Sequence, residues 1–228
     1  MNPFIKYPGG KMKEFHFVNQ FKPKVISRYF EPFVGGGSIY LNIGITNSYI
    51  NDKSEDLIHL YRYIQTQDTT FFNYLRELDR LWKMVEGDSS PSSTLFDLHD
   101  YSNYFTASLS NKKVRIQKLQ GSGLTISKED KQELFLTAKK TALYMCIRDF
   151  YNHHKRNSQQ HTACFYFMRE YCYSSMFRFS KAGVFNVPYG GRSYNFKYIT
   201  SKIDFMQSPT LIEYLQNTNI YRDTINNN

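Results

Sequence analysis

The sequence predicts an α/β fold that starts with a nucleoside-binding unit and continues into a mostly helical region. Val25 to Phe33 has the composition of a strand, and three glycines, Gly35 to Gly37, follow it. A short apolar helix from Ile39 to Ile43 and a second strand ending at Ile50 come next. Glycine lets the backbone turn sharply and approach a ligand closely, so this order of elements indicates a nucleoside site.

An acidic residue follows the second strand. Asp52 stands where such folds place a carboxylate for the ribose hydroxyls. Its alternative role is structural, because Asn51 to Ser54 also has the residues of a helix start. The two roles are compatible, since a carboxylate at a strand end beside a helix start can serve both.

Positive charge gathers in the second half of the chain. The 228 residues have a formal net charge of +9. Residues 1–110 contain 11 Lys and Arg against 12 Asp and Glu, which leaves 18 basic and 8 acidic residues to 111–228. Such asymmetry favours a polyanionic partner, and a nucleic-acid phosphate backbone is the first expectation.

Helices are predicted along most of the remaining chain. The first is Lys11 to Phe21, and Ser54 has the position of an N-cap for a helix to Gln65. Further helices are expected at Asp68 to Val85 and Ala163 to Cys172, and Ser127 starts a capping-box-like sequence that leads into a long helix to Asp149. Phe177 to Val187 alternates around a glycine-containing turn, which predicts a β-hairpin.

Several sequence motifs resemble those of a known family. Phe4 to Lys11, with Phe33 to Gly37 and Asn51–Asp52, is similar to the amino-terminal motifs of Dam-like DNA adenine methyltransferases, which use S-adenosylmethionine. Tyr173 to Phe179 and Gly183 to Gly191 resemble the target-recognition region of that family, closest to the members found in type IIS restriction-modification systems. The resemblance covers most of the chain.

This resemblance implies a fold and a division of the chain. The fold would be an incomplete Rossmann-like S-adenosylmethionine-dependent methyltransferase fold with an inserted, mostly helical DNA-recognition domain and a β-hairpin. Residues 1–86 would bind the cofactor, 87–200 would recognise double-stranded DNA, and 201–228 would return toward the catalytic domain.

The resemblance also implies cofactor contacts. Tyr7 and Lys11 would lie against S-adenosylmethionine, around the tight turn of Pro8 to Gly10. Glu31 is either a polar contact to the methionine moiety or a structural acid. The residues expected to bind the cofactor are Tyr7, Lys11, Glu31, Phe33, Gly35, Gly37 and Asp52.

A second group of residues is expected to contact DNA. Arg178, at the start of the hairpin, has the planar fork that addresses guanine in the major groove. Lys181 and Arg192 are expected to hold phosphates, which position the protein without reading sequence. The full expected set is Tyr173, Ser174, Met176, Arg178, Lys181 and Arg192.

One family motif is not found in this sequence. Family members carry an Asp-Pro-Pro-Tyr type motif that holds the adenine amino group, whereas the seven prolines here are all isolated. Asn186 to Tyr189 is similar to such a motif with one proline lost, but its neighbours match the recognition region. We therefore expect no catalytic residue in this chain and a heterodimer with a second polypeptide that carries the catalytic half. The alternative is a DNA-binding pseudo-methyltransferase without activity.

Physical chemistry leads to the same expectation. Parallel strands need cover on both faces, and a sheet of two or three strands leaves an edge and apolar surface open to water.

The sequence has no signal peptide or membrane span, and its three cysteines and its histidines match no zinc spacing. A cytoplasmic protein without a metal site or membrane contact is expected.

Overall fold

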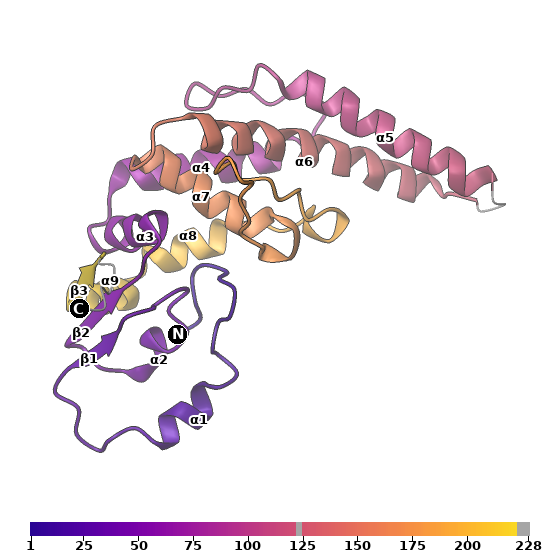
Figure 1. Ribbon diagram of the computed structural model, residues 1–228. Helices are drawn as coiled ribbons and strands as arrows, with labels where there is room; N and C mark the ends of the chain where they lie inside the picture. Colours follow the sequence, from indigo (N-terminus) through magenta and orange to yellow (C-terminus); the bar gives the residue numbers. More distant parts are fainter. Residues whose placement is uncertain (122–124, 223–228) are drawn as a thin grey trace.

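The computed structural model describes residues 1–121 and 125–222 and has a small parallel sheet at one end, from which helices extend (Figure 1). The strands are β1 (Tyr29–Glu31), β2 (Ser48–Asn51) and β3 (Thr218–Tyr221). They lie in the order β1-β2-β3, and both pairings are parallel. The predicted parallel sheet is therefore confirmed, with a first strand shorter than the expected Val25 to Phe33.

The two faces of this sheet differ in exposure. One face is buried and carries Ile50 and Thr218. The Thr218 hydroxyl forms a hydrogen bond with the hydroxyl of Tyr40, which covers this face. The other face carries three rings in a row: Phe30 stacks on Tyr49 at 4.6 Å between centroids, and Tyr49 lies 6.3 Å from Tyr221. Phe30 remains 60% exposed and Tyr221 44% exposed. Within the described residues, β1 pairs only with β2.

Local sequence signals determine where the helices next to the sheet begin. α2 (Tyr40–Ile43) follows the glycine turn, and α3 (Glu55–Gln65) begins where the Ser54 side chain accepts a hydrogen bond from the Leu57 amide. α4 (Thr69–Met84) is capped in the same way by Asp68. α1 (Phe15–Gln20) is shorter than expected and buries none of its residues.

The region between β2 and β3 is mostly helical. α5 (Tyr101–Gly121), which the sequence analysis did not predict, lies along α6 (Lys128–His153), and Figure 1 shows this pair reaching away from the sheet. α7 (Gln159–Tyr171) is buried from His161 onward and packs against α3, α4 and α6. α7 is therefore the centre of the helical core.

The chain then returns to the sheet. The expected hairpin has one antiparallel bridge, between Phe179 and Phe185, and no regular strands. α8 (Thr200–Met206) and α9 (Pro209–Gln216) lead back to β3. Among the described residues, every helix is too short or too polar to span a membrane. The division of the chain at residues 86 and 200 stays a prediction.

Candidate functional site

A cleft of about 240 Å³ lies at the carboxyl ends of β1 and β2. In open parallel sheets, this end is where ligands bind, because glycine-rich turns and strand-end side chains meet there. Six of the seven residues expected to bind the cofactor line the cleft: Tyr7, Lys11, Glu31, Phe33, Gly35 and Asp52.

The seventh residue, Gly37, shapes the glycine turn from behind. Gly35 and Gly37 have φ of +50° and +74°, a region that residues with a Cβ adopt at a cost. A Cβ on Gly37 would lie 2.5 Å from the Tyr61 hydroxyl oxygen. That hydroxyl donates a hydrogen bond to the carbonyl of Gly35 at 3.1 Å, so Tyr61 fixes the turn that the cleft requires.

Asp52 joins the glycine turn to α3. One carboxylate oxygen accepts from the Gly35 amide at 3.0 Å, and the other accepts from the Ser54 amide at 2.9 Å. A carboxylate has about four acceptor positions, so two stay available for ligand hydroxyls. Asp52 therefore holds the amide of Ser54, the residue that caps α3, and its ribose role stays a prediction.

Glu31 is an acid with a perturbed environment. Burial raises its pKa to about 6, against a hydrogen bond from the Tyr29 hydroxyl at 2.7 Å. The carboxylate is therefore ionised at neutral pH and faces the cleft, where it can accept hydrogen bonds from an ammonium group.

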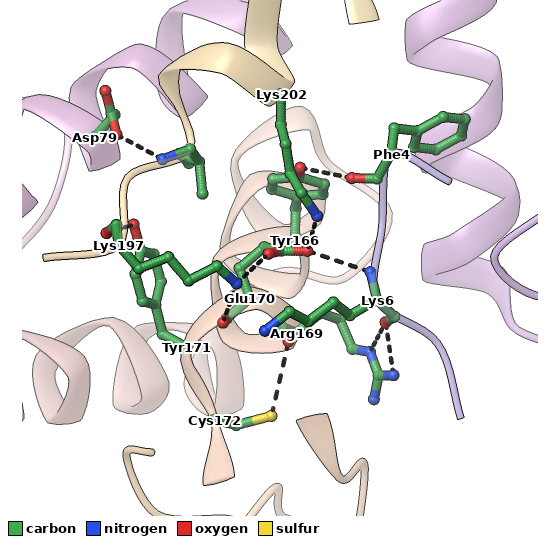
Figure 2. Close-up of polar contacts among 11 residues, drawn as sticks. Phe4, Lys6, Asp79, Tyr166, Arg169, Glu170, Tyr171, Cys172, Lys197 and Lys202 are labelled. Carbon is green, nitrogen blue, oxygen red and sulfur yellow. Dashed lines mark hydrogen bonds and ion pairs between the residues drawn. The ribbon is translucent and has the colours of Figure 1, made fainter. Parts of the chain in front are cut away.

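The segment that carries Tyr7 is fixed to α7 (Figure 2). The Tyr166 hydroxyl donates to the carbonyl of Phe4 at 2.8 Å, and the Arg169 guanidinium donates twice to the carbonyl of Lys6, at 3.0 and 2.8 Å. The Lys6 amide in turn donates to the Glu170 carboxylate at 3.2 Å. These anchors were not predicted, and their only signal in the sequence is an Arg-Glu pair within the otherwise apolar stretch from Ala163 to Cys172.

Arg169 also lies between the two expected sites. Its guanidinium carbon is 5.1 Å from the ring centre of Tyr7, in the cleft, and 4.9 Å from that of Phe177, at the base of the hairpin. Burial lowers the pKa of Arg169, and contact with two aromatic faces stabilises the buried cation.

Five of the six residues expected to contact DNA, all but Arg192, lie on one exposed segment between residues 173 and 181. Tyr173 is 52% exposed and Met176 38% exposed, while Ser174 and Ser175 both have φ of +51°. This left-handed pair turns the chain abruptly at the end of α7 and presents the side chains that follow. Arg178 is exposed, and its Nε donates to the Asn186 side chain at 3.2 Å.

A side chain from α6 holds the hairpin in place. The Asn152 amide group donates to the carbonyl of Phe185 at 3.1 Å and accepts from its amide at 2.9 Å, as a neighbouring strand would. Gly183, with φ of +75°, closes the turn that exposes Lys181. The hairpin is therefore rigid at its base and exposed at its tip.

Arg192 has a different environment from the other DNA candidates. Its guanidinium pairs with Asp130 at 3.2 Å and with Glu133, both on α6. A phosphate that binds Arg192 would have to displace these carboxylates, which costs free energy. The expected contact between Arg192 and a phosphate stays a prediction.

The segment that is similar to a catalytic motif is half buried, with Val187 and Tyr189 in the core and Asn186 and Pro188 exposed. Tyr189 is 8% exposed, its hydroxyl donates to Asn195 at 3.0 Å, and its ring packs against Trp82 and Tyr144. A ring held in this way cannot stack on a base. The expectation that Asn186 to Tyr189 is not catalytic stays a prediction.

Comparison with known proteins gives one family and several relatives. A family-wide sequence model described as D12 class N6 adenine-specific DNA methyltransferase matches residues 7–224. Type II methyltransferase M.MjaIII of Methanocaldococcus jannaschii is 26% identical over 201 residues, which cover 83% of this chain and 52% of that protein.

Two further relatives are named as a type II methyltransferase and as a DNA adenine methylase. Type II methyltransferase M.CviBI of Paramecium bursaria Chlorella virus NC1A is 22% identical over 228 residues, covering 99% of this chain and 59% of that protein. DNA adenine methylase of Escherichia coli (strain K12) is 33% identical over 75 residues, 33% of this chain and 27% of that protein. The chain spans little more than half the length of M.MjaIII and M.CviBI.

Proposed function

We propose that this chain, which belongs to the D12 class N6 adenine-specific DNA methyltransferase family, is the cofactor-binding and DNA-recognising subunit of a split site-specific DNA adenine methyltransferase. The observation that carries this proposal is the cleft at the strand ends, lined by six residues of the expected cofactor set, beside an exposed recognition hairpin. Residues 1–86 and 201–228 would form the cofactor part, and 87–200 the recognition part.

The residues of the cleft fit S-adenosylmethionine. Asp52 retains acceptor positions for ribose hydroxyls, ionised Glu31 suits the ammonium group of the methionine moiety, and a side chain at Gly35 would meet the Tyr7 ring at 3.1 Å. When bound, the cofactor supplies an electrophilic methyl group for the adenine amino nitrogen. The protein must hold an adenine that has left the DNA helix beside this cleft.

The uncovered face of the sheet supports the proposal of a second polypeptide. Phe30, Tyr49 and Tyr221 line a groove of about 450 Å³ on the uncovered face, and the neighbouring edge of β1 has no strand partner among the described residues. A partner that adds a strand beside β1 and covers these rings would complete the fold. That partner would also bring the Asp-Pro-Pro-Tyr type motif, since Tyr189 is committed to the core.

Cofactor binding is tested at Asp52. In the Asp52→Ala variant of the chain, or of its complex if a partner co-purifies, S-adenosylmethionine binding should weaken by about 1–3 kcal/mol, because buried hydroxyls and two backbone amides lose their acceptor. Isothermal titration calorimetry measures this difference. Lys53→Ala, at the neighbouring exposed residue, is the control. Equal affinity of the Asp52→Ala variant and the natural chain would refute the assigned site.

DNA recognition is tested on the hairpin. Arg178→Ala should relax discrimination at one base pair, at a cost of about 1–3 kcal/mol for the natural site only. Lys181→Ala should weaken binding to every sequence alike and reduce the salt dependence by about one unit of slope. Competition binding across a set of single-base variants separates the two. If both variants lose affinity uniformly, Arg178 is only a phosphate contact.

A further inference from the structure

Three lysines gather around one buried carboxylate, as Figure 2 shows. Glu170 on α7 is fully buried, and its two oxygens lie 2.7 Å from the ammonium groups of Lys197 and Lys202. One of these oxygens also accepts from the Lys6 amide. The negative charge of Glu170 is therefore already shared between two lysines and a backbone group.

The third lysine, Lys6, adds one more positive charge beside the same carboxylate. The Lys6 ammonium lies 4.9 Å from the ring centre of Tyr194, where Lys197 lies at 5.7 Å. Within the described part of the chain, no carboxylate lies within ion-pair distance of Lys6. With Arg169 alongside, four basic side chains surround a single acid. Burial, and then the proximity of Lys197, lowers the pKa of Lys6 to about 8.

A cavity of about 380 Å³ opens beside this cluster. Lys6 and Lys202 line it together with the hydroxyl-bearing residues Ser174 and Ser175 from the turn after α7. Tyr7 lines both this cavity and the cofactor cleft. The cavity thus lies between the expected cofactor position and the expected DNA-contacting segment.

We propose that Lys6 and Lys202, which line this cavity, bind one phosphodiester group of the DNA strand that enters between the cofactor cleft and the hairpin, and that Lys197 adds positive charge from beside Glu170. The inference rests on the proposed function, because it takes DNA as the ligand. A phosphate accepts hydrogen bonds from ammonium and hydroxyl groups, and its negative charge would balance the excess at this point. Glu170 would keep Lys197 and Lys202 in position while the cavity is empty.

Protonation gives this site a second observable property. The groups that face Lys6 are Glu170 on α7, Lys197 and Tyr194 on the segment before α8, and Lys202 on α8. A bound phosphate would favour the charged form of Lys6, so DNA binding near pH 8 to 9 should take up a proton. Affinity should accordingly fall as the pH rises through about 8.

The test is Lys6→Met in the chain, or in its complex if a partner co-purifies, with binding measured on a short DNA duplex. Losing one phosphate contact should reduce the slope of log K against log salt by about 0.9 and weaken binding roughly eightfold at 0.1 M salt. The pH dependence above 8 should diminish, and S-adenosylmethionine affinity should not change. The melting temperature should stay equal or rise, because like charges no longer crowd. Lys6→Arg should retain binding.

Controls and contrary outcomes separate the two proposals. Lys24→Met, at an exposed lysine between α1 and β1, should leave DNA binding unchanged. If the natural chain binds DNA and Lys6→Met binds with the same affinity and salt slope, the phosphate site is wrong and the proposed function stands. If Lys6→Met instead weakens only S-adenosylmethionine binding, the cavity holds the cofactor carboxylate. Failure of the natural chain to bind any DNA would refute the proposed function.

Discussion

Methylation of DNA by the purified chain alone should be undetectable, at least about a thousandfold below that of the chain combined with a polypeptide carrying an Asp-Pro-Pro-Tyr type motif. Two observations lead to this expectation. The sequence holds no adjacent prolines, and Tyr189, the nearest substitute for the stacking ring, is buried against Trp82. Without a group to hold the adenine amino nitrogen, cofactor and base would not be aligned.

The experiment is co-expression with the product of the neighbouring reading frame, followed by transfer of labelled methyl groups to DNA. The two chains should co-purify, because completing a parallel sheet buries roughly 2,000 Å² or more of largely apolar surface. Phe30→Asp should abolish co-purification, since it places an unpaired carboxylate on the uncovered sheet face. Val114→Asp, at a half-exposed valine of α5, is the matched control. Strong methylation by the partner-free chain would instead make Asn186 to Tyr189 a catalytic candidate again.

Signals that act within a few residues were readable from the sequence. Ser54 and Ser127 accept hydrogen bonds from amides three residues later, so the starts of α3 and α6 were predicted from these caps. The strand-turn-helix order around Gly35 to Gly37 predicted the cleft in the same way, because glycine and strand-end positions are local properties. Glu31, Phe33, Gly35 and Asp52 gather for this reason, whereas Tyr7 and Lys11 come from the amino-terminal segment and were expected from the family resemblance.

Elements without a periodic apolar face were missed. Of the described side chains of α5, only Tyr101 is buried, and the helix packs mainly along α6, so its sequence has no strong helical pattern. The first strand was predicted to be longer than it is, because an apolar sequence does not guarantee that a segment pairs with the sheet. Val25 and its neighbours are apolar enough for a strand, yet Val25 is 88% exposed and pairs with nothing in the described sheet.

Contacts across long sequence separations could not be predicted. Arg169 and Glu170 reach the backbone of Lys6 over 163 and 164 residues, and no spacing rule relates such distant positions. The pairing depends on α7 passing under the amino-terminal segment, which is a property of the whole fold. A charged pair inside an apolar helix signals that partners exist but does not identify them.

Glu170→Gln should cost the folded chain about 3–5 kcal/mol, because Lys197 and Lys202 lose the buried charge that neutralises them. Against a typical total of roughly 5–15 kcal/mol, this loss is large. The amide of glutamine can still accept from the Lys6 backbone, so the fold should persist at low temperature. S-adenosylmethionine affinity should also fall, since the segment carrying Tyr7 is held at Lys6.

The pH dependence of unfolding distinguishes loss of charge from loss of packing. Burial opposes ionisation of Glu170, but Lys202 and Lys197 outweigh it and hold its pKa below the ordinary value of 4.5. The unfolded chain therefore binds this proton more readily than the folded chain. The contribution of Glu170 is complete above about pH 5 and is lost as the pH falls through its lowered folded-state pKa. In denaturant titrations from pH 7 to 3, the gap in unfolding free energy between Glu170→Gln and the natural chain should narrow as the pH falls below about 5. Glu213→Gln, at an exposed glutamate of α9, should follow the natural chain throughout. A constant gap between the Glu170→Gln and natural curves at every pH would show that Glu170 acts by shape alone.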